Sequence, residues 1–75
     1  MIKIKHVYVA RDRDGELFAY DYRPFYTESW GVWMAPTGKI YKITGLLFDH
    51  LKYDDEPIKT KILSSNLEQL KPFNA

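Results

Sequence analysis

The amino-terminal part of the chain alternates between apolar and polar positions in the manner of a β-hairpin. One side of segment 2–11 carries Ile2, Ile4, His6, Tyr8 and Ala10, and the other carries Lys3, Lys5, Val7, Val9 and Arg11. The second side changes from charged to apolar halfway along. We therefore expect a strand over 2–11 whose start is half exposed and whose end is covered on both faces. Asp12-Arg13-Asp14-Gly15 predicts the turn, and a returning strand is expected over 16–22.

The middle of the chain predicts shorter strands separated by turns. Segment 23–29 contains Pro24, which disfavours a central strand, so a connection is expected there. Short strands are expected over 30–35 and 39–43, because turn residues separate these two apolar runs. Segment 44–51 has leucines at helical spacing, with Thr44 as a candidate N-cap, and it predicts either a short helix or a single helical turn. A loop is expected over 53–57.

The carboxyl-terminal part predicts an edge strand followed by a helix. Segment 58–63 alternates, and its lysines would discourage pairing with other chains. Ser65 and Glu68 have the spacing of a capping box, and Pro72 would end the helix that begins there. The predicted fold class is thus α+β and mainly β. It is a small antiparallel sheet of four or five strands, with one short helix or helical turn and a C-terminal helical tail.

Length and composition narrow the class of protein. We expect 75 residues to form one domain, because so short a chain does not divide into two packed cores. The absence of cysteine removes disulfides, thiolate metal sites and cysteine nucleophiles. The net charge of +1 gives no global field directed at nucleic acid or at an anionic membrane. No apolar run approaches the length of a membrane span, so a cytoplasmic location without a membrane partner is expected.

Catalytic and metal-binding groups do not form a recognised motif. His6 and His50 lie on unrelated segments, and neither has a metal ligand at a suitable spacing. The acidic turn 12–16 weakly resembles a calcium loop, but the later ligands of such a loop are missing. The acidic run 54–56 is interpreted as a solvated loop. We therefore expect no catalytic residue, no metal and no cofactor; the neighbouring pair Asp49 and His50 is a weak enzymatic alternative.

Aromatic residues are the most informative part of the composition. Six Tyr, four Phe and two Trp are more rings than a small core needs, and segment 20–33 is the densest stretch. Core packing, a protein interface and a nucleic-acid platform all remain open for this stretch. The candidate partner-binding residues are Tyr22, Arg23, Phe25, Tyr26 and Trp30. The alternative, binding of single-stranded nucleic acid, would use Arg11, Arg13 and Arg23. Homodimerisation through the aromatic region would cover one face of the sheet.

A series of residues gives the chain a family resemblance. The series is Ala10-Arg11-Asp12-x-Asp14-Gly15-x-Leu17-x-x-Tyr20, then Pro24, Trp33, Leu47-Phe48 and Pro57-x-x-x-x-Ile62. Over residues 7–62, this pattern resembles short strand-rich proteins of tailed bacteriophages, prophages and gut-bacterial mobile elements. The resemblance implies a strand-rich fold, a phage or prophage setting and the cytoplasm of a host cell, but no activity. We therefore expect a non-enzymatic accessory factor that binds a host or phage protein, with a small protein that binds single-stranded nucleic acid as the alternative.

Overall fold

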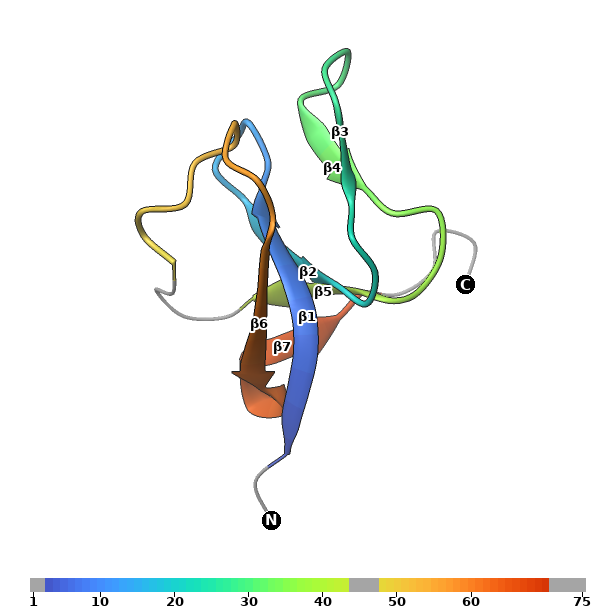
Figure 1. Ribbon diagram of the computed structural model, residues 1–75, viewed down its shortest axis with the longest axis vertical. Helices are drawn as coiled ribbons and strands as arrows, with labels where there is room; N and C mark the ends of the chain where they lie inside the picture. Colours follow the sequence, from blue (N-terminus) through green and yellow to red (C-terminus); the bar gives the residue numbers. More distant parts are fainter. Residues whose placement is uncertain (1–2, 44–47, 71–75) are drawn as a thin grey trace.

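The computed structural model describes residues 3–43 and 48–70, and its first two strands form a hairpin (Figure 1). Strand β1 (Ile4–Arg11) pairs antiparallel with β2 (Leu17–Tyr20). In the turn, Gly15 has a φ of 95°, a backbone conformation that favours glycine. The side chain of Asp14 accepts a hydrogen bond from the backbone N–H of Glu16 at 2.9 Å. The hairpin predicted from the alternating pattern and the Asp-Gly turn is thus confirmed.

Within the described residues, this hairpin lies at the centre of a five-stranded antiparallel sheet with strand order β6-β1-β2-β5-β7. Strand β5 (Ile40–Ile43) pairs with β2, and β6 (Ile58–Leu63) pairs with β1. Strand β7 (Leu67–Gln69) pairs with β5, and the 3₁₀ turn η1 (Ser64–Asn66) joins the two outer strands. The predicted antiparallel sheet and the predicted edge position of 58–63 are confirmed.

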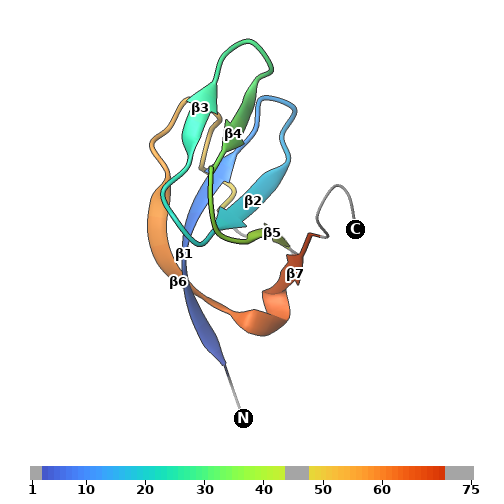
Figure 2. The same cartoon turned by 90° about the vertical axis from the view of Figure 1, so that its right-hand side faces the viewer.

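The sheet is strongly curved, because a short turn connects its two edges (Figure 2). The four residue steps from Leu63 to Leu67 span at most about 14 Å. The outer strands of a flat five-stranded sheet would lie about 19 Å apart. The strands must therefore curl toward one another, and one face becomes enclosed.

The enclosed face forms the hydrophobic core. The strands and the loop after β5 contribute Val7, Val9, Leu17, Ala19, Tyr41, Ile43, Leu51 and Ile62, with Phe48 and Leu67 packed against them. The alternation along β1 follows the prediction: Ile4 is exposed near the start, whereas the neighbours Val9 and Ala10 are both buried near the end. Burial on both faces means that a second layer covers the end of β1.

That second layer includes a two-stranded sheet that projects from the curved sheet (Figures 1 and 2). It consists of β3 (Phe25–Thr27) and β4 (Val32–Met34), with Tyr26 opposite Trp33. The strand expected over 30–35 is thus present, but the prediction that 23–29 is only a connection was wrong. Pro24 lies just before β3, so its missing N–H removes no hydrogen bond from the ladder.

The carboxyl-terminal helix predicted from Ser65 and Glu68 is not present in the described residues, and this prediction is corrected. The 3₁₀ turn η1 is followed directly by β7, in which Gln69 lies opposite Tyr41. Strand β5 offers an unpaired edge, and an isolated helix of this length is not stable. The segment therefore gains more hydrogen bonds as a strand. Pro72, the expected end of the helix, lies outside the described residues.

The helix or helical turn expected over 44–51 is described only in part. Thr44 and the leucines that follow it lie outside the described residues. The remaining segment, 48–51, is a turn in which the N–H of Leu51 donates to the carbonyl of Phe48 at 3.0 Å. This turn places the Leu51 side chain in the core.

Two glycines with positive φ provide a matched pair of substitutions. Gly38 (φ 85°) and Gly15 (φ 95°) have the same kind of backbone, but their surroundings differ. A Cβ at Gly38 would lie 2.7 Å from Cδ2 of Tyr22 and 2.9 Å from Cβ of Asp21, whereas nothing lies within 4 Å of a Cβ at Gly15. We expect Gly15→Ala to cost about 1 kcal/mol from the backbone conformation alone, and Gly38→Ala about 2 kcal/mol. Urea unfolding measures both. Equal losses would show that Tyr22 moves aside at no cost.

Candidate functional site

The aromatic stretch 20–33 divides into buried, half-buried and exposed rings. Tyr20 is 1% exposed and belongs to the interior, whereas Tyr26 and Trp33 are half-buried. Tyr22 is 59% exposed, Phe25 53% and Trp30 73%. Three of the five candidate partner-binding residues are thus exposed rings, and Tyr26 is more enclosed than they are.

Two side chains of the β1–β2 hairpin hold β4 by the backbone of Trp33. The N–H of Trp33 donates to Oδ1 of Asp12 at 2.8 Å, and its carbonyl accepts from the hydroxyl of Tyr20 at 3.1 Å. Asp12 is only 7% exposed. Burial raises the pKa of its carboxyl above the ordinary value of 3.8, although the hydrogen bond from the Trp33 N–H acts in the opposite direction. Burial likewise raises the pKa of Tyr20. The β3–β4 hairpin is therefore anchored through its main chain.

Arg13 and three rings form the inner side of this anchored hairpin. Nε of Arg13 donates to the Tyr26 hydroxyl at 3.2 Å, and its Nη2 donates to the carbonyl of Glu28 at 3.2 Å. The Tyr26 ring centroid lies 5.2 Å from that of Trp33 and 6.1 Å from that of Tyr53. The indole N–H of Trp33 donates to the carbonyl of Tyr53 at 3.2 Å. These contacts connect the hairpin to the loop before β6.

The outer side of the hairpin and the Trp30 ring at its tip remain exposed. Phe25 lies directly opposite Met34, and directly opposed residues share one face while neighbours along a strand alternate. This pair therefore faces away from Tyr26 and Trp33. Trp30 lies in the turn that closes the hairpin. A shallow pocket of about 250 Å³ at this tip is lined by Arg13, Asp14, Trp30, Gly31 and Val32.

The three arginines considered for nucleic-acid binding have three different environments. Arg11 donates to three backbone carbonyls: Nε to Leu51 at 2.6 Å, Nη1 to Gly15 at 2.7 Å and Nη2 to Phe48 at 3.0 Å. Arg13 belongs to the ring cluster described above. Arg23 forms an exposed ion pair with Glu56. No pattern in the sequence indicates the structural role of Arg11, because the groups that it binds are carbonyls of the main chain.

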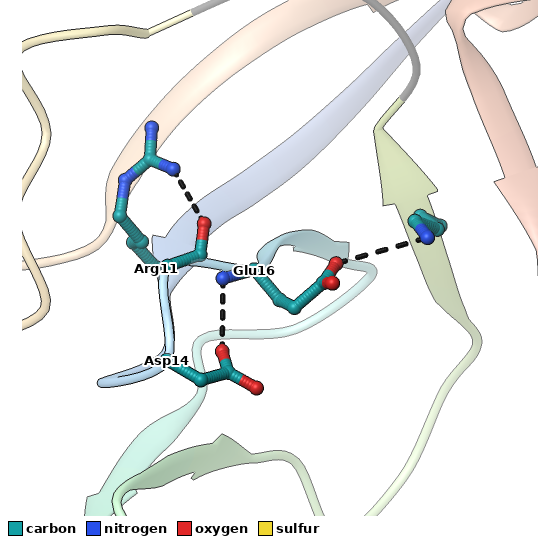
Figure 3. A network of polar contacts seen from close by, with 5 residues as sticks. Arg11, Asp14 and Glu16 are labelled. Atoms are coloured by element: carbon teal, nitrogen blue, oxygen red, sulfur yellow. Dashed lines mark hydrogen bonds and ion pairs between the residues drawn. The ribbon is translucent and has the colours of Figure 1, made fainter.

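Figure 3 shows the polar contacts around the β1–β2 turn. Arg11 reaches the turn carbonyl, Asp14 accepts from the backbone of Glu16, and Glu16 extends toward Nζ of Lys42 at 3.7 Å. Each carboxylate in this view thus has a local partner, which agrees with the interpretation of 12–16 as a turn. Among residues 3–43 and 48–70, no group of three His, Asp or Glu side chains is placed to hold a metal ion.

A second polar surface lies on the pair of strands β1 and β6, and the sequence hypotheses did not include it. His6 lies opposite Lys61, and Tyr8 lies opposite Lys59. Nζ of Lys59 lies 5.8 Å from the centroid of the Tyr8 ring. The sequence pattern identified the lysines of this segment only as edge residues, because the register that pairs them with β1 is not encoded locally.

No family model, no curated protein and no solved structure matches the chain. In the described part of the chain, no helix is both long enough and apolar enough to cross a membrane.

Proposed function

We propose that this protein is a non-enzymatic accessory factor, encoded by a bacteriophage or prophage, that binds a host or phage protein through its β3–β4 hairpin. The observation that carries the proposal is the 73% exposure of Trp30 at the tip of a hairpin whose second strand is fixed to the β1–β2 hairpin. The phage setting rests on the resemblance in sequence described above.

The physical basis of the proposal is the cost of exposing large rings. A tryptophan exposed to this extent gains little from folding, but it gains the full burial energy when a partner covers it. Tryptophan, tyrosine and arginine are also the residues most enriched among those that dominate binding energies at protein interfaces. Phe25 and Met34 form a second exposed apolar pair, on the outer side of the hairpin.

The anchoring of the hairpin strengthens the proposal. Asp12 and Tyr20 bind both backbone groups of Trp33, and the N–H of Arg13 donates to the carbonyl of Gly31 at 2.9 Å. A binding loop that is already ordered loses less conformational entropy on association than a flexible loop does. We therefore expect a partner with an apolar cleft that accepts the tip of the hairpin.

The test replaces the exposed rings and measures binding. We expect Trp30→Ala to weaken binding to the partner by about 2 kcal/mol, which is roughly thirtyfold, and the double variant with Phe25→Ala to weaken it further. Ile4→Ala is the matched control, because Ile4 is an exposed apolar residue at the start of β1, whereas the β3–β4 hairpin is bound at the other end of that strand. A photo-crosslinking residue at position 30 identifies the partner in the producing cell, and titration calorimetry measures the affinities.

Two results would contradict this proposal. The first is an unchanged affinity of the Trp30→Ala and Phe25→Ala double variant for the partner captured by the wild type. The second is crosslinking of position 30 only to another copy of the chain, accompanied by a dimer in light scattering. That result would assign the hairpin to homodimerisation instead.

A further inference from the structure

We propose that the outer face of the β1–β6 ladder is a separate binding surface for single-stranded nucleic acid. Its location differs both from the hairpin and from the arginines that the sequence indicated. The pairs His6 with Lys61 and Tyr8 with Lys59 are directly opposed in the ladder. Directly opposed residues point to the same side, and so do residues two apart along one strand. All four side chains therefore share one face of the ladder.

The two lysines of this face are not engaged by acidic side chains. Among residues 3–43 and 48–70, the ion pairs involve Lys5, Arg23 and Lys42, and neither Lys59 nor Lys61 takes part in one. Both residues are exposed. Two ammonium groups on one face of a strand, spaced by two residues, suit the phosphates of a flexible nucleic-acid strand, whose binding releases counterions.

A pocket that Lys59 helps to line supplies an aromatic surface. It measures about 200 Å³ and is lined by His6, Val7, Tyr8, Asp21, Tyr22 and Lys59. The Tyr22 ring is 59% exposed, and it packs so closely on Gly38 that a Cβ there would lie 2.7 Å from the ring. Gly38 thus supports one side of the ring and leaves the rest accessible. Such a ring next to a lysine allows a base to stack while its phosphate is neutralised.

The one acidic side chain that lines the pocket is a carboxylate already paired with a lysine. Oδ1 of Asp21 lies 3.3 Å from Nζ of Lys5, and Oδ2 accepts a hydrogen bond from the backbone N–H of Lys39 at 3.0 Å. It therefore carries little uncompensated charge that would repel a phosphate.

The combination of ring and lysine favours single-stranded nucleic acid over other polyanions. An acidic peptide would pair with the lysines but would have no planar group to place on Tyr22. In a duplex the bases are stacked inside, so the ring would have no base to contact. Arg11 is not part of the surface, because three backbone carbonyls already occupy its guanidinium.

The first experiment measures the contribution of charge. Fluorescence anisotropy with a labelled deoxythymidine or uridine oligonucleotide of about ten residues should show binding at low salt. If both lysines contact phosphates, each contributes roughly 0.7 to the negative slope of log K against log salt concentration. The double variant Lys59→Gln with Lys61→Gln should therefore reduce that slope by about 1.4 and lower the affinity at least about tenfold. The control is Lys42→Gln with Lys52→Gln, which changes the net charge equally and should leave the slope almost unchanged.

The second experiment measures the contribution of stacking. Tyr22→Leu keeps an apolar contact with Gly38 but removes the ring, and we expect it to weaken binding by roughly five- to hundredfold. Tyr22→Phe keeps the ring and should bind like the wild type. Circular dichroism confirms that each variant is folded. The Trp30→Ala and Phe25→Ala double variant should bind the oligonucleotide normally, so failure of this proposal is distinguishable from failure of the proposed function.

Three outcomes would overturn the inference. One is no change in anisotropy at low salt. Another is an oligonucleotide affinity that falls no more in the Lys59→Gln and Lys61→Gln double variant than in the Lys42→Gln and Lys52→Gln control. The third is tighter binding of a polyglutamate peptide or of phosphatidylserine vesicles than of the oligonucleotide, since either would assign the surface to a different partner.

Discussion

Replacing Arg11 by alanine is expected to destabilise the protein by about 3 kcal/mol, since a single guanidinium binds three backbone carbonyls. Two of these carbonyls, those of Phe48 and Leu51, belong to the turn that places Leu51 in the core. The third belongs to Gly15 in the β1–β2 turn. The side chain therefore joins two segments that are distant in sequence. Its loss would remove one donor from each carbonyl, so that Phe48 would keep only the N–H of Leu51, and it would release the turn from the sheet.

Two further variants separate this role from a general effect of charge. Arg11→Lys should recover at most about 1 kcal/mol, because an ammonium group cannot reproduce the planar arrangement of donors that contacts three acceptors. Arg23→Ala removes the same side chain from an exposed ion pair with Glu56 and should cost less than about 1 kcal/mol. Urea unfolding followed by far-ultraviolet circular dichroism gives all three values. A urea midpoint for Arg11→Ala equal to that of the wild type would show that the three hydrogen bonds make no net contribution to the free energy of unfolding.

The parts of the fold that could be predicted from sequence are those fixed by local pattern. The alternation over 2–11 and the Asp-Gly turn gave the β1–β2 hairpin, because side-chain period and turn chemistry are properties of neighbouring residues. The strand at 39–43 and the edge strand at 58–63 follow from the same kind of pattern.

The parts that could not be predicted depend on contacts between distant residues. Strand β3 exists because Tyr26 and Trp33 pair across a turn and because Asp12 and Tyr20 fix the far side of β4. Three residues are too few for a detectable period. The capping box at Ser65 and Glu68 is a real helix signal, yet pairing with β5 prevails because that edge is open.

The candidate site divides in the same way. An excess of rings over 20–33 is visible in the composition, and exposed Tyr22, Phe25 and Trp30 agree with it. Which rings are buried was not predictable, because that depends on how the β3–β4 hairpin folds onto the sheet. The face shared by Tyr8 and Lys59 likewise follows only from the register of β1 with β6.

Replacing Asp12 by alanine is the second substitution with a large expected effect, a loss of about 2 to 3 kcal/mol. The buried carboxylate is the acceptor for the N–H of Trp33 at 2.8 Å, and alanine would leave that donor unpaired between the hairpin and the sheet. Asp12→Asn keeps an acceptor oxygen and should preserve the contact. Trp33 carries the affected backbone group, so a urea titration followed by tryptophan fluorescence in a Trp30→Phe background measures the change. An Asp12→Ala variant as stable as the wild type would show that the carboxylate does not contribute to the anchoring of β4.

The pH dependence of the asparagine variant provides the sharpest form of this prediction. Burial raises the pKa of Asp12 above 3.8, so its contribution to stability is present below pH 3.8 and is lost as the pH rises through the raised value. Asparagine does not titrate. The stability of Asp12→Asn relative to the wild type should therefore increase as the pH rises through this window.

Asp21 provides a control with the opposite sign. Burial alone would raise its pKa, but the N–H of Lys39 and the ammonium of Lys5 together lower the pKa below 3.8. Its contribution is present above pH 3.8 and is lost as the pH falls through the lowered value. The stability of Asp21→Asn relative to the wild type should thus decrease as the pH rises. Two aspartate-to-asparagine variants of one protein should have pH slopes of opposite sign, and slopes of the same sign would contradict the environment assigned to Asp12.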